Sequence, residues 1–168
     1  TAAVAADAGA RVARMPFNVG IGSAVQTGFR VAADEGFDVA IQVDGDGQHP
    51  ADQVPLLLLA IIESGANYVI GSRFAERGAY RPSFARRSGI VVFSRLVSLL
   101  AHQRVTDTTS GFRAADRRTI RLFAEHYPHD YPEVEAVILA KRNALRIVEI
   151  PVSMRQRSTG RSSITPIR

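Results

Sequence analysis

The stretch "DVAIQVDGDGQHP", residues 38–50, decides how the chain is expected to fold. Its apolar, β-branched first half predicts a buried strand over 38–44. Asp44 and Asp46 then stand one residue apart in a glycine-containing turn, and a helix is expected to begin near Pro50. Two like charges this close repel each other, so the pair is costly unless solvent or a cation takes up the charge.

Strands and helices alternate outward from this stretch. Apolar periodicity and glycine stops predict helices over 2–8, 84–101, 116–125 and 133–142. A further helix follows the loop that opens 17–36 and ends at Gly36, and another begins with Pro50 and Asp52 and runs to about Ile62. The expected strands are 11–15, 38–44, 68–74 and 145–155, and "VTDTTSGFRAA" is a strand or a loop. This alternation predicts one α/β domain over residues 1–168, with a mainly parallel sheet flanked by helices and a polar, mobile tail at 156–168. Ligands of such sheets bind at the carboxyl ends of the strands.

The composition is that of an ordinary globular protein, with 46% apolar and 22% charged residues among 168. There is no cysteine, which excludes disulfides and thiolate metal sites. The net charge of +5 comes almost wholly from arginine, which suits bidentate contact with phosphate, although a basic solvated surface is an equal alternative. The most apolar run, 56–62, is far shorter than the roughly 20 residues that span a bilayer.

The aspartate pair suits a magnesium or manganese ion, because both metals prefer oxygen ligands and keep water or phosphate oxygens in their shell. Spacing alone fits a solvated Asp-Gly turn even better. An EF-hand is excluded, since His49 and Pro55 stand at its glycine and glutamate positions. The loop "NVGIGSA", 18–24, opens a helix whose amides could hold an anion, but it lacks the lysine of a P-loop. Arg73 ends the strand "YVIGSR" and is expected on the same sheet edge as the aspartates.

Several motifs occur together and in order: "VDGDGQHP", "VIGSRF", "RRSG", "DTTSGFRA" and "VEIPVSMRQRSTGRSSI". In this set the chain resembles the family-2 glycosyltransferases of the GT-A fold, in the dolichyl-phosphate mannose synthase-like, polyprenyl-phosphate glycosyltransferase branch. The resemblance covers essentially the whole chain. It implies a Rossmann-like sheet and the inverting transfer of a sugar from a UDP- or GDP-linked donor to a polyprenyl phosphate, with Mg²⁺ or Mn²⁺ as cofactor.

The resemblance also implies roles for individual residues. Asp44, Asp46 and Gln48 match the metal and diphosphate motif. Asp107 is the third catalytic candidate, with an orienting or helix-capping carboxylate as the equal alternative. The residues that match substrate-binding positions are Asn18 and Gly22 on the donor side, Arg73, Arg86 and Arg87 for phosphates, Ser110 and Arg113 on the acceptor side, Glu135 in the following helix, and Arg157, Gly160 and Ser162 in the loop over the diphosphate.

Two departures from the family pattern matter. The opening motifs "VVIPxYNE" and "DDGSxDxT" are absent, so the domain is expected to lack its first strand–helix unit, which leaves open that this piece is inactive by itself. Ser163 stands where eukaryotic-type members carry a phosphate-binding lysine, which favours a bacterial-type relative. A lipid acceptor requires a membrane surface, so the expected location is peripheral, at the cytoplasmic face. The oligomeric state is left open.

Two other function classes share some of these sequence features. A nucleotidyltransferase also uses acidic pairs, but it needs a basic residue in its glycine-rich donor loop, and "NVGIGSA" has none. A catalytically silent basic domain is the non-enzyme alternative. Nucleic acid is not an expected partner, because few aromatic residues interleave with the arginines and the acidic pair would repel a phosphate backbone.

Overall fold

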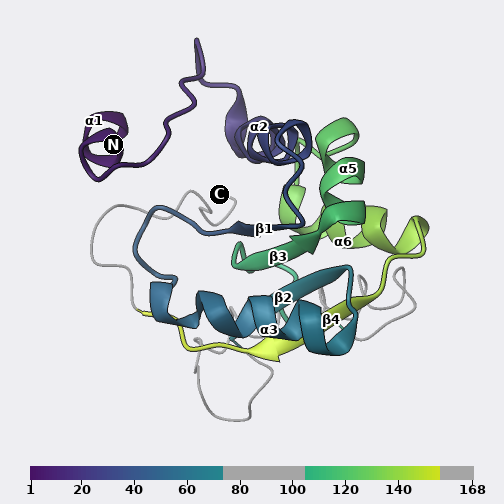
Figure 1. Cartoon of the computed structure of the whole chain (residues 1–168). Helices are drawn as coiled ribbons and strands as arrows, with labels where there is room; N and C mark the ends of the chain where they lie inside the picture. The colour runs from purple at the N-terminus through teal and green to yellow at the C-terminus, as the bar shows by residue number, and fades with distance from the viewer. Residues whose placement is uncertain (74–104, 156–168) are drawn as a thin grey trace, which may run out of the picture.

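The computed structural model describes residues 1–73 and 105–155 (Figure 1). Its elements are α1 (Ala2–Asp7), α2 (Gly20–Asp34), β1 (Val39–Gln42), the 3₁₀ turn η1 (Ala51–Gln53), α3 (Val54–Ser64), β2 (Tyr68–Ser72), β3 (Arg113–Asp116), α5 (Arg117–Glu125), α6 (Pro132–Arg142) and β4 (Ile147–Pro151). Helices and strands are interspersed in the described residues, and the α/β class is confirmed. No helix in the described ranges is long and apolar enough to cross a bilayer.

The four described strands form one sheet in the order β1-β3-β2-β4. β2 and β4 pair in parallel, whereas β3 pairs antiparallel with both β1 and β2. Three strands therefore point the same way, as a mainly parallel sheet requires, and β3 runs against them. Because of this reversal, Arg113 at the start of β3 lies opposite Gln42 at the end of β1.

Helices cover both faces of the sheet. Figure 1 shows α2, α5 and α6 on one side and α3 on the other. Strand alternation separates the two cores: Tyr68 and Ile70 of β2 face the α2/α5/α6 side, and Val69 faces α3. On the first side Phe29, Phe123, Tyr68 and Tyr127 pack edge-on or tilted, with ring centroids 5.2–5.5 Å apart. The sheet is thus held as the middle of three layers, with its strand ends at the rim.

Two expectations about strands are wrong. Residues 11–15 form no strand, and Val12 and Met15 are exposed. A strand needs a neighbour for its backbone groups, and no described strand lies beside this segment, while Arg11 reaches out to Glu35 at 2.7 Å. β1 is half-buried rather than buried, since β3 is its only partner among the described strands. The expected helix at 84–101 and the tail at 156–168 lie outside the described residues.

The junction between β3 and α5 depends on Asp116. Its Oδ1 accepts hydrogen bonds from the backbone N–H and the hydroxyl of Thr119, both at 2.8 Å, which caps α5. Its Oδ2 accepts from Asn67 Nδ2 at 2.7 Å, next to the start of β2. One carboxylate therefore joins a helix start to the neighbouring strand.

We expect Asp116→Ala to lower the free energy of unfolding by about 1–2 kcal/mol, the usual cost of losing an N-cap. Asp34→Ala, at the exposed C-terminal end of α2, is the matched control and should change stability little. Chemical denaturation of both variants measures the difference. Equal stability of the two variants would contradict the role given to Asp116.

Candidate active site

One edge of the sheet gathers the polar residues that the sequence singled out. Asp44 follows β1 and Arg73 follows β2, and both strands end at this edge. Arg113 begins β3 here because that strand is reversed. The loop 105–112, which leads into β3, must therefore cross the same edge. Segments far apart in the sequence are brought together by the direction of a single strand.

The aspartate loop is shaped by its own hydrogen bonds. Asp46 Oδ1 accepts from the backbone N–H of Gln48 at 3.0 Å, a local turn that fixes one of its carboxylate oxygens. Gly47 has a φ of +76°, in the region that favours glycine. The Asp44 side chain remains 38% exposed, so solvent reaches it at the edge of the sheet.

His49 supports this loop from the buried side. Its ring is buried and stacks on Phe112, with centroids 5.0 Å apart. Burial lowers the pKa of His49, and the nearby Asp44 and Asp46, which act in the opposite direction, do not reverse the shift. The ring is therefore neutral at neutral pH, and its Nδ1 accepts the Asp44 backbone N–H at 3.0 Å. His49 has a structural role, holding the backbone of an aspartate.

Gly111 makes room for the Asp44 carboxylate. A Cβ atom at Gly111 would come within 2.6 Å of Asp44 Oδ1 and closer still to Oδ2, so the Asp44 carboxylate would have to move away. The absence of a side chain at Gly111 thus sets where the Asp44 carboxylate lies. The sequence analysis missed this residue. Its only signal was a glycine in "SGFR", and the contact depends on how two distant segments meet.

Arg73 and Asp107 form a bidentate ion pair. Arg73 Nε donates to Asp107 Oδ2 at 2.7 Å and Nη2 donates to Oδ1 at 2.8 Å. The Arg73 backbone N–H and the Thr109 hydroxyl add bonds to the same carboxylate at 3.1 and 3.2 Å. The Asp107 side chain is fully buried, whereas that of Arg73 is 22% exposed. The pair therefore shows only its cationic side to solvent.

Burial alone would raise the pKa of Asp107, but the hydrogen bonds and charge of Arg73 outweigh it and the net shift is downward. Asp107 is therefore ionised at neutral pH, and both of its oxygens already accept hydrogen bonds. This arrangement fits the orienting alternative for Asp107 better than proton transfer to or from a substrate.

Ser110 and Arg113 brace the loop from inside. Arg113 is 1% exposed and donates to the carbonyl oxygens of Ser110 and Thr108 at 2.6 and 3.0 Å, and to the Tyr68 hydroxyl at 2.8 Å. Ser110 is buried, and its Oγ accepts from the Phe112 N–H at 3.2 Å. Both residues shape the loop rather than face an open surface.

Three other candidates make local contacts. Asn18 Oδ1 accepts from the Gly20 N–H at 3.1 Å at the start of α2. Gly22 packs against the backbone of Pro128 and His129, where a Cβ would not fit. Glu135 Oε1 accepts from the Tyr131 N–H at 3.2 Å at the start of α6. The remaining candidates, Arg86, Arg87, Arg157, Gly160 and Ser162, lie outside the described residues.

The metal motif supplies few protein ligands. In residues 1–73 and 105–155 no group of three or more histidine, aspartate or glutamate side chains is placed to hold an ion. Asp44 and Asp46 offer two hard oxygen donors, and the Gln48 amide donates to the Arg155 carbonyl at 3.4 Å. Such a site fits Mg²⁺ or Mn²⁺, which take most of their six oxygens from water and a diphosphate.

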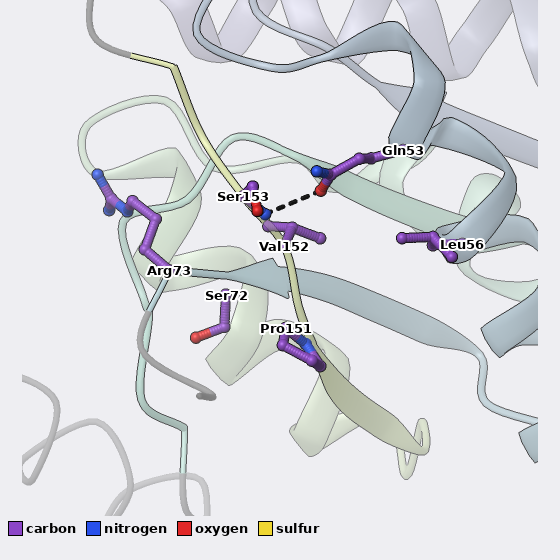
Figure 2. A pocket seen from close by; sticks show the side chains of 7 residues that line it. All are labelled: Gln53, Leu56, Ser72, Arg73, Pro151, Val152 and Ser153. Atoms are coloured by element: carbon purple, nitrogen blue, oxygen red, sulfur yellow. Dashed lines mark hydrogen bonds between the residues drawn. The ribbon is translucent and has the colours of Figure 1, made fainter. Parts of the chain in front are cut away.

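A small pocket lies beside Arg73 (Figure 2). It holds about 150 Å³ and is lined by Gln53, Leu56, Ser72, Arg73, Pro151, Val152 and Ser153. Gln53 Oε1 accepts from the Ser153 N–H at 2.9 Å, which ties η1 to the end of β4. The volume is below the roughly 300 Å³ of ordinary ligand pockets, so it could hold only part of a substrate.

Residues 1–124 match the model of glycosyl transferase family 2. A UDP-N-acetylglucosamine–dolichyl-phosphate N-acetylglucosaminyltransferase of Methanococcus voltae is 33% identical over 138 residues, 80% of this chain and 55% of that protein. An undecaprenyl-phosphate mannosyltransferase of Micrococcus luteus is 31% identical over 87% of this chain and 61% of that protein. A dolichol-phosphate mannosyltransferase of Pyrococcus furiosus is 29% identical over 92% of this chain and 43% of that protein.

The chain thus spans about half the length of these relatives. The family match covers well over half of the chain, and its span includes the aspartate loop, Arg73, Asp107 and Gly111. The resemblance read from the motifs is confirmed. The chain belongs to glycosyl transferase family 2, in the dolichyl-phosphate mannose synthase-like branch.

Proposed function

We propose that this chain is the catalytic part of an inverting enzyme that moves a sugar from a nucleotide-sugar, UDP- or GDP-linked, to a polyprenyl phosphate. The observation that supports this most directly is the meeting of an exposed carboxylate loop at Asp44 with a braced guanidinium at Arg73 on one sheet edge. A donor diphosphate and an acceptor phosphate are both anionic, and each needs a cationic partner. The names of the relatives support the same substrate classes.

The reaction is a single in-line displacement. An oxygen of the acceptor phosphate attacks the anomeric carbon, the new carbon–oxygen bond forms as the bond to the nucleoside diphosphate breaks, and the configuration inverts. A phosphate monoester has a second pKa of about 6, so the nucleophile is already anionic at neutral pH. A strong general base is not required, which agrees with a buried, ionised Asp107 whose oxygens are engaged with Arg73.

Asp44 and Asp46, with Gln48, would hold the Mg²⁺ or Mn²⁺ ion, which when bound neutralises charge on the leaving diphosphate. Arg73 binds a substrate phosphate through its exposed side while Asp107 fixes it from behind. Arg86, Arg87, Arg157 and Ser162 are predicted to add further phosphate contacts. For Asn18, Gly22, Ser110, Arg113 and Glu135 the role that fits their contacts is to shape the loops and helix starts around the substrates.

Replacing either carboxylate tests the proposal. In the full-length parent protein, Asp44→Ala and Asp46→Ala should each lower sugar transfer by at least about 100-fold, the scale of losing one preorganised electrostatic contact. Asp52→Ala, a nearby exposed aspartate in η1, should keep near-wild-type turnover. The assay follows both the glycosylated lipid phosphate and the released nucleoside diphosphate.

Near-wild-type turnover in either Asp44→Ala or Asp46→Ala would discard the metal assignment. Transfer of a nucleoside monophosphate to a sugar phosphate would instead favour the nucleotidyltransferase alternative. Absence of any turnover in the intact parent protein, with a nucleotide-sugar panel and manganese, would favour the silent binding domain.

Gly111 offers a second test that leaves every ligand in place. Gly111→Ala puts a methyl group where the Asp44 carboxylate lies, so we expect Mn²⁺ affinity in the presence of a nucleoside diphosphate to fall by about 10–100-fold. Gly28→Ala in α2 is the matched control, because a Cβ there meets nothing within 4 Å and the residue lies outside the aspartate loop. Calorimetry or electron paramagnetic resonance of bound Mn²⁺ measures both. Equal Mn²⁺ affinities of the two variants would contradict the role given to Gly111.

We also propose that the parent protein works at the cytoplasmic face of a membrane, where its lipid acceptor resides. The arginines between residues 73 and 95 are candidates for contact with anionic headgroups, each contributing about 1 kcal/mol near the surface. Binding to vesicles that contain anionic lipid should then weaken steeply as salt rises. Binding that does not depend on salt would exclude this route. Flotation of the protein with vesicles at several salt concentrations provides the measurement.

A further inference from the structure

Glu149, in the middle of β4, holds the segment that carries Asp107. Its carboxylate oxygens accept from the Thr106 N–H at 2.8 and 2.9 Å and from the Asp107 N–H at 2.8 Å. The Thr106 hydroxyl donates to Oε2 at 3.0 Å. Two consecutive backbone amides and a hydroxyl thus converge on one half-buried carboxylate. Hydrogen bonds to an ionised acceptor are roughly twice as strong as neutral ones.

These bonds take the place of a sheet ladder. Residues 106 and 107 lie outside the described strands and helices, and their N–H groups are hydrogen-bonded to the Glu149 carboxylate. The Thr106 hydroxyl also lies 3.0 Å from Ser72 Oγ at the end of β2. Removing the carboxylate at 149 would take away the partner of the Thr106 and Asp107 N–H groups and weaken the attachment of the segment to β4.

The segment in turn sets the position of Arg73. Asp107 directly follows Thr106 and binds Arg73 through both of its oxygens and through the Arg73 backbone N–H. β4 lies parallel to β2, with Glu149 opposite Ile70, close to where β2 leads into Arg73. A continuous set of charged contacts therefore runs from a rigid strand, through the segment, to the guanidinium.

We propose that Glu149 is a positioning residue for Arg73: it fixes residues 106 and 107 so that Asp107 holds the guanidinium in the orientation that receives a substrate phosphate. This inference rests on the proposed function of Arg73 as a phosphate ligand. Glu149 contacts no substrate and acts on Arg73 only through Thr106 and Asp107. A residue that only stabilises the fold would make the same contacts. The test must therefore detect an effect on substrate binding that depends on Arg73.

The test is a double-mutant cycle in the full-length parent protein, with Glu149→Gln, Arg73→Lys and the double variant. Glutamine keeps the shape of Glu149 but removes its charge and puts an NH₂ group where Oε2 accepts from the Thr106 N–H and hydroxyl. Lysine keeps the charge of Arg73 but cannot make the bidentate bond. Glu63→Gln, exposed on α3, is the matched control. KM is measured separately for the nucleotide-sugar and for the polyprenyl phosphate, together with kcat and the midpoint of unfolding.

We expect Glu149→Gln to raise the KM for the same substrate that Arg73→Lys affects, by about 10–100-fold, the scale of a misplaced binding group. The KM of the double variant should be little higher than that of the more affected single variant, because both changes disturb the same phosphate contact. Thr106→Val, which removes the hydroxyl contacts to Glu149 and Ser72 but keeps the backbone amide bonds to Glu149, should raise the same KM by a smaller factor and serves if Glu149→Gln folds poorly. Glu63→Gln should leave both KM values unchanged.

Effects that multiply in the double variant would overturn the inference, since they would show that Glu149 does not act through Arg73. So would a Glu149→Gln or Thr106→Val protein that is less stable but has unchanged KM values. If Arg73→Lys raises a KM and the changes at 149 and 106 do not, the inference fails while the proposed function stands. If Arg73→Lys raises neither KM, the phosphate role of Arg73 fails, and the inference fails with it.

Discussion

The direction of β3 is the constraint on which the site depends. A strand that runs against its neighbours must begin at the edge where they end, so the segment leading into β3 has to cross the carboxyl ends of β1 and β2. That crossing puts Gly111 against Asp44 and Asp107 against Arg73. Had β3 been parallel, residues 105–112 would lie at the opposite rim, and neither contact could form.

The carboxylates at this edge divide into two kinds according to their surroundings. Asp44 keeps much of its side chain in solvent and lies in a loop shaped by its own hydrogen bonds, which leaves it open to a cation. Asp107 and Glu149 accept several hydrogen bonds each from described groups, and Asp107 is fully buried against a guanidinium. A buried carboxylate of this kind is tolerated because it is paired and saturated with donors, and it then acts as a fixed point for its neighbours. An exposed carboxylate can therefore contact a ligand, whereas a buried one positions the residues that contact the ligand.

Much of the fold followed from local signals, and the exceptions have physical causes. The α2, α5 and α6 helices show apolar periodicity with glycine, proline or aspartate at their ends, so their positions could be predicted. The strand at 11–15 could not be judged, because strand formation depends on a neighbour that local sequence does not specify. The direction of β3 was equally hidden, since "RAAD" is too short to show a pattern. Arg113 was predicted on the acceptor side of the substrate site, and the fold buries it among carbonyl oxygens.

The place of the aspartate pair was predictable, because an apolar run followed by Asp and Gly predicts a strand end and a turn, whereas the contacts of Gly111 and Glu149 were not. Their roles lie in contacts between segments some 40 to 70 residues apart, and a glycine or a glutamate alone carries no sign of such a partner. The motifs "SGFR" and "VEIP" indicated the family, but they did not indicate the contacts that Gly111 and Glu149 make.

In the proposed reaction, which brings two polyanions together, the bracing of Arg73 has an energetic advantage. A free arginine side chain carries about 2 kcal/mol of rotamer entropy, which it would lose on gripping a phosphate. In this chain the bidentate bond to Asp107 has already ordered the guanidinium before any substrate arrives, and the cost is met during folding. The same pairing withdraws part of the positive charge, so the arginine binds phosphate less tightly than an isolated one would. That balance suits a group that must hold an anionic nucleophile and still let its oxygen attack, because the geometry is kept while ground-state binding stays moderate.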